Sequence, residues 1–318
     1  MSRKEARKHL KRQDVSRYLN DATYVDWLER LKKIATSIFE WQGLPASMDE
    51  RRIELALFER GQCAFLKDEY YGFINTNATS GGKINIYGLP TMLNCYAYTY
   101  HTIRKMWNGL PVEPDSESDL EDAILVMNTW ERYPTIAGIQ LYCQRLTDVQ
   151  RAIDTNVKMQ KYPYLLTTDT NQKMSMEIMY DEIDGNKPAI FIDKNFDMDR
   201  IRSIPTEAPY VVDKLNMYKN ELFNEALTFL GINNLYRKKE RLITDETDQN
   251  NELINLNMES FLIPRKKACE QFNERYGMNI DVKVRSDLHN LIKEVDNAFE
   301  EAEEKLIQRK ALEEVTNE

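Results

Sequence analysis

The sequence predicts a mainly α-helical protein with smaller β modules, that is, a fold of the α+β class. Long stretches carry apolar residues at three- and four-residue steps, which is the period of an amphipathic helix. Residues 62–100 instead hold short apolar runs separated by glycines, a pattern typical of short strands joined by turns. The 318 residues, 42% hydrophobic and 30% charged, suffice to bury a sizeable core in one to three domains.

Two helices are predicted before the strand-rich segment. An apolar stripe from Tyr24 to Phe39 indicates the first helix, which ends before Gly43 and Pro45. The second helix is predicted from Met48 to Glu59.

Short strands are predicted at 64–66, 70–74 and 83–87. Within this segment, Ser80-Gly81-Gly82-Lys83 lacks the leading glycine and the four-residue spacer of a phosphate-binding loop, so we expect a hairpin turn there. The acidic stretch from Glu113 to Asp122 follows, in a loop marked by prolines and serines. Its acids would need to converge from rigid elements to hold a catalytic metal.

Two long helices are predicted in the middle of the chain. The first runs from Pro134 to about Lys161, roughly 40 Å, and the second from Pro209 to Leu230, roughly 33 Å, with Gly231 ending it. Their similar lengths allow them to pair antiparallel and to bury their apolar stripes together. Between them we expect a small αβ module, with strands at 164–168 and 189–193 and a helix at 175–183.

The last third of the chain alternates charged or polar segments with predicted helices and a strand. A basic cluster after Gly231 is followed by a polar run, 244–257, which we expect to form a loop. Pro264 is expected to open a helix that Gly277 closes, and residues 280–284 alternate as a strand. A last helix is predicted from Asp287, packed between subunits or on its own subunit.

The two ends of the chain carry opposite charge. The net charge is −9, the tail from Glu294 is acidic, and the first 17 residues are basic. Such ends often meet different partners, although solvated surface charge is the alternative for each. The basic residues are Arg3, Lys4, Arg7, Lys8, Lys11, Arg12 and Arg17.

Several classes of site find no support in the sequence. The four cysteines and three histidines are scattered, so we expect buried free thiols and no metal site. No apolar run approaches the ~20 residues of a membrane span, and the charged N-terminus has no apolar core behind it, so we do not expect it to be a secretory signal. No nucleophile, Walker motif or cofactor site is visible, which favours a protein that is not an enzyme. The alternatives are a metal-dependent DNA-processing enzyme that uses the acids of 113–122, and a monomeric nucleic-acid-binding module.

Three consecutive motifs carry a resemblance to a known family. They read A-P-Y-V-V-D-K-L-N at 208–216, T-F-L-G-I at 228–232 and K-K-E-R-L-I-T-D-E at 238–246. The chain resembles the upper collar, or portal, proteins of small protein-primed podophages (Picovirinae). Phe39-Glu40-Trp41, Leu44-Pro45 and Gly185-Asn186 also occur at corresponding places in that family.

The resemblance implies a non-enzymatic head–tail connector, a dodecameric ring whose central channel serves packaging, retention and ejection of double-stranded viral DNA. Its partners would be the major capsid protein, the lower collar and tail proteins and a packaging ATPase, with a packaging RNA left open. No membrane and no cofactor are expected. The protein would reside at the head–tail vertex of the virion, after assembly in the host cytoplasm. The implied segments are a basic arm (1–17), a wing (18–132 and 258–285), stem helices (133–161 and 207–231), a clip (162–206), a channel loop (238–257) and a crown (286–318).

The resemblance also suggests which residues meet nucleic acid. Lys214 stands in the V-V-D-K motif and is the first candidate for a ring of channel lysines, with pairing to Asp213 or to an acid of a neighbouring subunit as the alternative. Relatives can carry another channel lysine nine residues earlier, where this chain has Pro205. The channel loop would add Lys238, Lys239 and Arg241. The basic arm would grip nucleic acid at the motor-facing end through Arg3, Lys4, Arg7, Lys8, Lys11 and Arg12.

Overall fold

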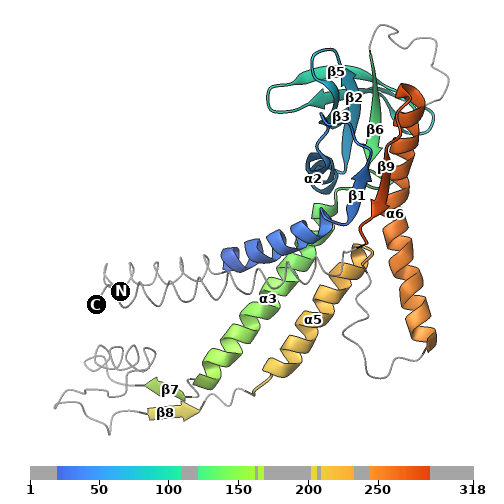
Figure 1. Ribbon diagram of the computed structural model, residues 1–318. Helices are drawn as coiled ribbons and strands as arrows, with labels where there is room; N and C mark the ends of the chain where they lie inside the picture. The colour runs from blue at the N-terminus through green and yellow to red at the C-terminus, as the bar shows by residue number, and fades with distance from the viewer. Residues whose placement is uncertain are drawn as a thin grey trace, which may run out of the picture. The chain divides into compact units, whose positions relative to one another are not determined.

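The computed structural model describes residues 20–108, 121–161, 164–167, 202–205, 209–232 and 244–286 (Figure 1). The chain forms two compact units: unit 1 combines residues 1–147 with 221–318, and unit 2 comprises residues 148–220. The predictions for the basic arm, the acidic loop before residue 121, the crown and most of the clip lie outside the described residues.

Unit 1 contains a closed five-stranded barrel. Its strands are β2 (Gln62–Asp68), β3 (Gly72–Ile84), β4 (Pro90–Tyr96), β5 (His101–Met106) and β6 (Asp122–Met127). Neighbouring strands pair antiparallel, except for a short parallel contact between β5 and β6 that completes the closure. Closure leaves no free sheet edge, and the interior is filled by buried side chains including Ala64, Leu66 and Leu93. The strands predicted at 64–66 and 70–74 correspond to β2 and the start of β3, whereas the one predicted at 83–87 covers only the end of β3 and the turn after it. Strands β4, β5 and β6 were not predicted.

The expected hairpin turn at Ser80-Gly81-Gly82-Lys83 is wrong. These residues lie inside β3, where the pairing with β4 shifts register between Gly81 and Ile84, as at a β-bulge. Gly82 has a φ of 67°, which the bulge requires and which side chains disfavour. The turn comes later, where the Asn85 side chain accepts hydrogen bonds from the backbone N–H groups of Tyr87 and Leu89.

The N-terminal helix ends at residue 35, earlier than predicted. Phe39 belongs to strand β1 (Phe39–Gln42), which pairs antiparallel with β9 (Asp281–Val284). The predicted second helix is confirmed as α2 (Glu50–Arg60), which Asp49 caps by accepting a hydrogen bond from the Arg51 N–H. Because β1 finds its partner more than 200 residues away, local periodicity could not separate it from the preceding helix.

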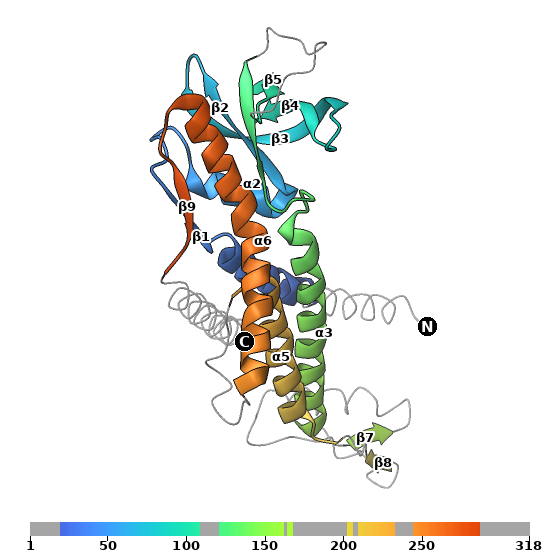
Figure 2. The same cartoon turned by 90° about the vertical axis from the view of Figure 1, so that its right-hand side faces the viewer.

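Helix α6 corrects two predictions at once. It runs from Thr244 to Tyr276, so residues 244–257 are helical rather than part of a loop, and Pro264 lies within the helix instead of opening it. The buried residues Ile254, Phe261, Ala268 and Phe272 recur at helical steps on one face. Ile254 lies within the polar run, so the sequence showed no helical stripe there. Figures 1 and 2 show α6 lying alongside β6 and β9.

Helices α3 (Thr135–Lys161) and α5 (Val212–Phe229) confirm the two long helices. In unit 2 they continue toward a small antiparallel ribbon of β7 (Tyr164–Thr167) and β8 (Arg202–Pro205). The strand at 164–168 was predicted, but its partner at 202–205 was not. The expected helix at 175–183 and strand at 189–193 lie outside the described residues.

Candidate functional site

The helix pair α3–α5 is the first candidate for a functional element. In unit 1, Tyr142 of α3 packs on Phe229 of α5, with ring centroids 5.9 Å apart. Gly138, one turn earlier, lets the Phe229 ring approach, since a Cβ there would lie 2.6 Å from the ring. In unit 2, the Lys219 ammonium donates to the Gln150 side chain over 3.1 Å. In unit 2, the later residue Asn156 of α3 contacts Pro209 and Val211, which precede Lys219, and this order confirms the predicted antiparallel pairing.

Apolar stripes hold the pair together. Five buried residues of α3 recur at three- and four-residue steps, and those of α5 do the same. Each fully buried Leu, Ile or Phe contributes roughly 1.5–3 kcal/mol relative to exposure. The residues are Ile139, Cys143, Leu146, Val149 and Ile153 on α3, and Leu222, Phe223, Ala226 and Leu227 on α5, with Leu230 directly after its end.

The start of α5 is set by Asn156 of α3. The Asn156 amide donates to the Pro209 carbonyl over 3.0 Å and accepts from the Val211 N–H over 3.3 Å. These bonds hold residues 209–211 in a non-helical conformation before the helix, so α5 begins at Val212 and not at Pro209.

The end of α5 is set by Gly231, as predicted. Its φ is 76°, the Ile232 N–H donates to the Leu227 carbonyl, and the Gly231 N–H donates to the Thr228 carbonyl. This is the hydrogen-bond pattern of a Schellman cap. A Cβ on Gly231 would lie 2.6 Å from the backbone of Met258 in α6, so only glycine fits both the conformation and the contact.

Lys214 lies on the exposed face of α5. No ion pair joins it to any described residue, and its neighbour Asp213 is equally exposed. Glu221 and Glu225 are exposed further along the same helix. Lys238, Lys239 and Arg241 lie outside the described residues, as do all the candidate residues of the basic arm.

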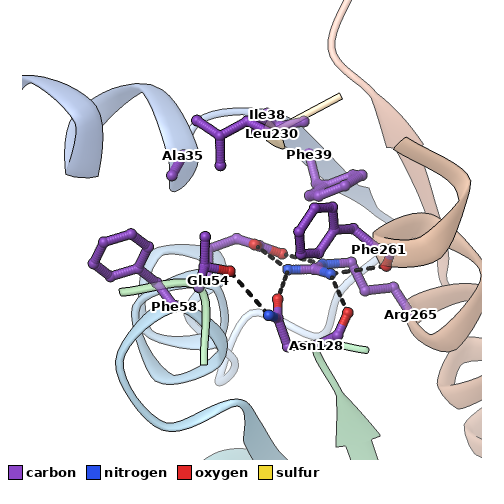
Figure 3. Close-up of a pocket in the computed structure, with 10 residues that line it drawn as sticks. Ala35, Ile38, Phe39, Glu54, Phe58, Asn128, Leu230, Phe261 and Arg265 are labelled. Atoms are coloured by element: carbon purple, nitrogen blue, oxygen red, sulfur yellow. Dashed lines mark hydrogen bonds and ion pairs between the residues drawn. The ribbon is translucent and has the colours of Figure 1, made fainter. Parts of the chain in front are cut away.

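Sequence reasoning missed a buried polar junction in unit 1 (Figure 3). Arg265 of α6 is 2% exposed, and its guanidinium pairs with the Glu54 carboxylate of α2 at 2.9 and 3.1 Å. It also donates to the side chain and carbonyl of Asn128, after β6, and to the Phe261 carbonyl. All five N–H donors of Arg265 therefore have an acceptor. Its guanidinium also lies 4.3 Å from the centroid of the Phe39 ring.

The junction also includes side chains of β1 and α3. The Trp41 indole of β1 donates to Glu54 over 2.9 Å, and the Asn128 amide donates to the Thr135 hydroxyl at the start of α3. One network thus joins β1, α2, β6, α3 and α6. The cavity beside it measures about 10 Å³, room for about one water molecule, so the junction is structural and no organic ligand fits.

Acids proposed for metal chemistry have other partners where the structure describes them. The Glu121 carboxylate pairs with Arg104, and Asp122 pairs with Arg275 at 2.6 Å. Across the described ranges, no three His, Cys, Asp or Glu residues come together as a metal site. The remaining acids of the stretch, from Glu113 to Asp119, lie outside those ranges.

The four cysteines are free and buried, as expected from their scatter. Burial raises the pKa of Cys95 to about 11 and those of Cys143 and Cys269 to about 12. Of the helices within the described residues, none is both long and apolar enough to cross a membrane.

Comparisons with known proteins find similar solved structures and one matching family. A chain of the portal and tail of native bacteriophage P68 is 16% identical, with 92% of this chain and 96% of that one covered and a TM-score of 0.48. An HK97 family phage portal protein from Corynebacterium diphtheriae is 10% identical, with 85% and 93% covered and a TM-score of 0.42. The family model of the phage connector (GP10) matches residues 6–289, which is most of the chain. This protein, with its barrel, its antiparallel helix pair and its long α6, belongs to the phage connector (GP10) family.

Proposed function

We propose that this connector assembles into a closed dodecameric ring at the head–tail vertex of the virion, and that double-stranded viral DNA passes through the central channel during packaging, retention and ejection. The observation that carries the proposal is the α3–α5 pair, whose buried stripes face each other while large apolar side chains stay exposed on the outer faces. Leu141 and Val157 of α3 and Met217 of α5 are each about half exposed or more, at 51%, 49% and 64%. Neighbouring copies in a closed ring would cover such faces.

In this proposal the chain works as a passive conduit and not as an enzyme. Its family is structural. A net charge of −9 per subunit repels the duplex, which lowers friction on moving DNA. Lys214, exposed and without an ion pair among the described residues, would supply one ring of positive charge facing the channel. Lys238, Lys239 and Arg241 would add a second, and the basic arm would meet nucleic acid at the motor-facing end.

The other implied partners follow from this place in the particle. The major capsid protein would hold the outer part of the ring, and the lower collar and tail proteins would dock at the clip end. A packaging ATPase would engage the connector while the head fills in the host cytoplasm. The wing would consist of 18–132 and 258–285, and β1–β9 pairing within unit 1 supports that combination.

The test is complementation of a phage that lacks this protein. Without it we expect heads that contain no genome and bear no tail, and the wild-type chain restores both. Heads that fill and acquire tails without the protein would refute the connector function.

Lys214→Glu, compared with Lys158→Glu, tests the channel residue. Both lysines are exposed in unit 2, on α5 and on α3 respectively, and both changes alter the charge equally. Because only Lys214 is proposed to face DNA, Lys214→Glu should change the packaging rate and Lys158→Glu should not. Equal rates in the two variants would remove Lys214 from the channel.

A further inference from the structure

Unit 1 exposes two surfaces of complementary chemistry. The first, here called the arginine–tyrosine strip, lies over α2, β4 and the loop after β6. The second, here called the glutamate–leucine stripe, lies on α6. The strip consists of Arg52, Arg60, Tyr96, Tyr98 and Arg132, and the stripe of Glu252, Leu253, Leu256, Glu259 and Ile263.

The strip is an ordered ladder of guanidinium and phenol groups. The Arg60 guanidinium donates to the Tyr96 hydroxyl over 2.8 Å, and its carbon lies 5.5 Å from the centroid of that ring. Arg52, two helical turns earlier on α2, lies 5.8 Å from the ring centroid of Tyr98, which is 95% exposed. Arg132 is oriented by donating to the Ser80 hydroxyl over 3.0 Å.

These three arginines form no ion pair with any carboxylate in the described part of the chain, although acids outnumber bases 52 to 43 overall. The nearby acid Glu59 is already paired with Lys32. Arginine and tyrosine held in fixed positions are the residue types that dominate the energetics of protein interfaces. The strip is therefore a preorganised cationic surface that needs an acidic partner.

The stripe on α6 has the opposite character. Leu253, Leu256 and Ile263 are 51%, 64% and 46% exposed, and the exposed Glu252 and Glu259 flank them. No lysine or arginine occurs between 252 and 263. Neither glutamate pairs with a base among the described residues. An apolar line edged by unpaired carboxylates matches the arginines and phenol rings of the strip in both charge and polarity.

The two surfaces point in opposite directions. At about 100° per residue, Arg52 and Arg60 lie about 160° and about 120° around α2 from Glu54, so both point away from it. By the same geometry, the stripe lies on the side of α6 opposite Arg265. Because Glu54 and Arg265 pair with each other across the interior, the strip and the stripe face outward on two sides of unit 1. In the view of Figure 1, α2 is drawn to the left of β1 and α6 to its right.

We propose that the arginine–tyrosine strip of one copy docks on the glutamate–leucine stripe of the next copy. The inference rests on the proposed ring and names one of its interfaces. Two different, opposed surfaces on one chain are what a head-to-tail ring requires, whereas a two-fold dimer would use one surface twice. Pairing three cations with two anions at each contact also offsets the repulsion between subunits of net charge −9.

Charge reversal tests the pairing. One variant carries Arg52→Glu and Arg60→Glu, and the other carries Glu252→Lys and Glu259→Lys. Each alone places like charges across the interface, so the protein concentration needed for ring formation should rise at least about tenfold. An equimolar mixture should restore rings, because alternating the two variants places opposite charges at every contact. A control variant with Lys83→Glu and Lys283→Glu, both exposed elsewhere on unit 1, should assemble like the wild type.

The readout is native mass at micromolar concentration, with circular dichroism as the check of folding; recovery in the mixture itself shows that both variants are folded. If the wild type forms no ring, the proposed function fails. If the wild type and both variants form rings equally well, the ring stands and this interface is refuted. The interface is also refuted if the arginine variant forms normal rings but is not incorporated into heads, since the strip would then serve an acidic segment of another phage protein.

Discussion

Replacing Arg265 by Met removes the centre of the buried junction while keeping a long apolar side chain. The change leaves the Glu54 carboxylate, itself 2% exposed, with the Trp41 indole as its only remaining donor among the described residues. The Asn128 and Phe261 carbonyls lose a donor as well. We therefore expect a large loss of stability in unit 1.

The magnitude follows from the burial of the pair. Removing one partner of a buried ion pair costs about 3–5 kcal/mol, because the other charge is left uncompensated. Glu54→Gln leaves the guanidinium without its counter-ion and should cost a similar amount. The double variant, Arg265→Met with Glu54→Gln, buries no charge and should be more stable than the sum of the two losses predicts, by at least about 2 kcal/mol.

The assay is urea unfolding followed by circular dichroism, with all variants at one protein concentration because assembly adds to apparent stability. Lys267→Met is the matched control, since Lys267 makes only an exposed ion pair with Glu270 on the same helix. Its cost should stay below about 1 kcal/mol. A loss below about 1 kcal/mol for Arg265→Met, or strictly additive losses in the double variant, would refute the role assigned to the junction.

Three other predictions concern single positions. Gly231→Ala should destabilise the protein by about 2 kcal/mol or more in thermal unfolding, because of its φ of 76° and the contact with the Met258 backbone; an unchanged stability would contradict the cap. Hydrogen bonds from the backbone N–H of Tyr71 and the Tyr100 hydroxyl lower the pKa of Asp68 below 3.8, despite some opposing burial. This stabilisation is present above the usual pKa and is lost as pH falls through the folded-state pKa, so wild type should lose more stability than Asp68→Asn between about pH 5 and pH 2. All four thiols should resist a thiol reagent at about pH 8 until the protein unfolds, because burial raises their pKa values; rapid labelling of the native protein would contradict that burial.

Local signals explain what the sequence could predict. The bounds of helix α2 are indicated by its Asp49 cap and by Gly61, and α5 ends where Gly231 interrupts a clear apolar stripe. Helix α3 has no proline or further glycine after Gly138 to break its period. In each case, the residues that decide the element lie within it or at most two residues beyond it.

The missed features depend on distant partners. Arg265 reads as a surface residue because its acceptors, Glu54 and Asn128, lie 211 and 137 positions away. Where the structure describes burial in the polar run at the start of α6, residues 252–257, only Ile254 is buried, too few to show a stripe. Strands β5 and β6 are defined by their partners in the barrel, since β6 pairs with β2 across 57 to 65 positions, from Leu66↔Ala123 to Gln62↔Met127. For the candidate site, the position of Lys214 on α5 could be read from the motif, whereas the surfaces on α2 and α6 emerge only from the folded unit.

Electron microscopy of the purified protein, viewed down the particle axis, tests the central claim most directly. The account predicts closed rings of twelve copies around a central hole, with a native mass of twelve chains at micromolar concentration. Monomers or dimers at that concentration, or open filaments without a closed ring, would contradict it.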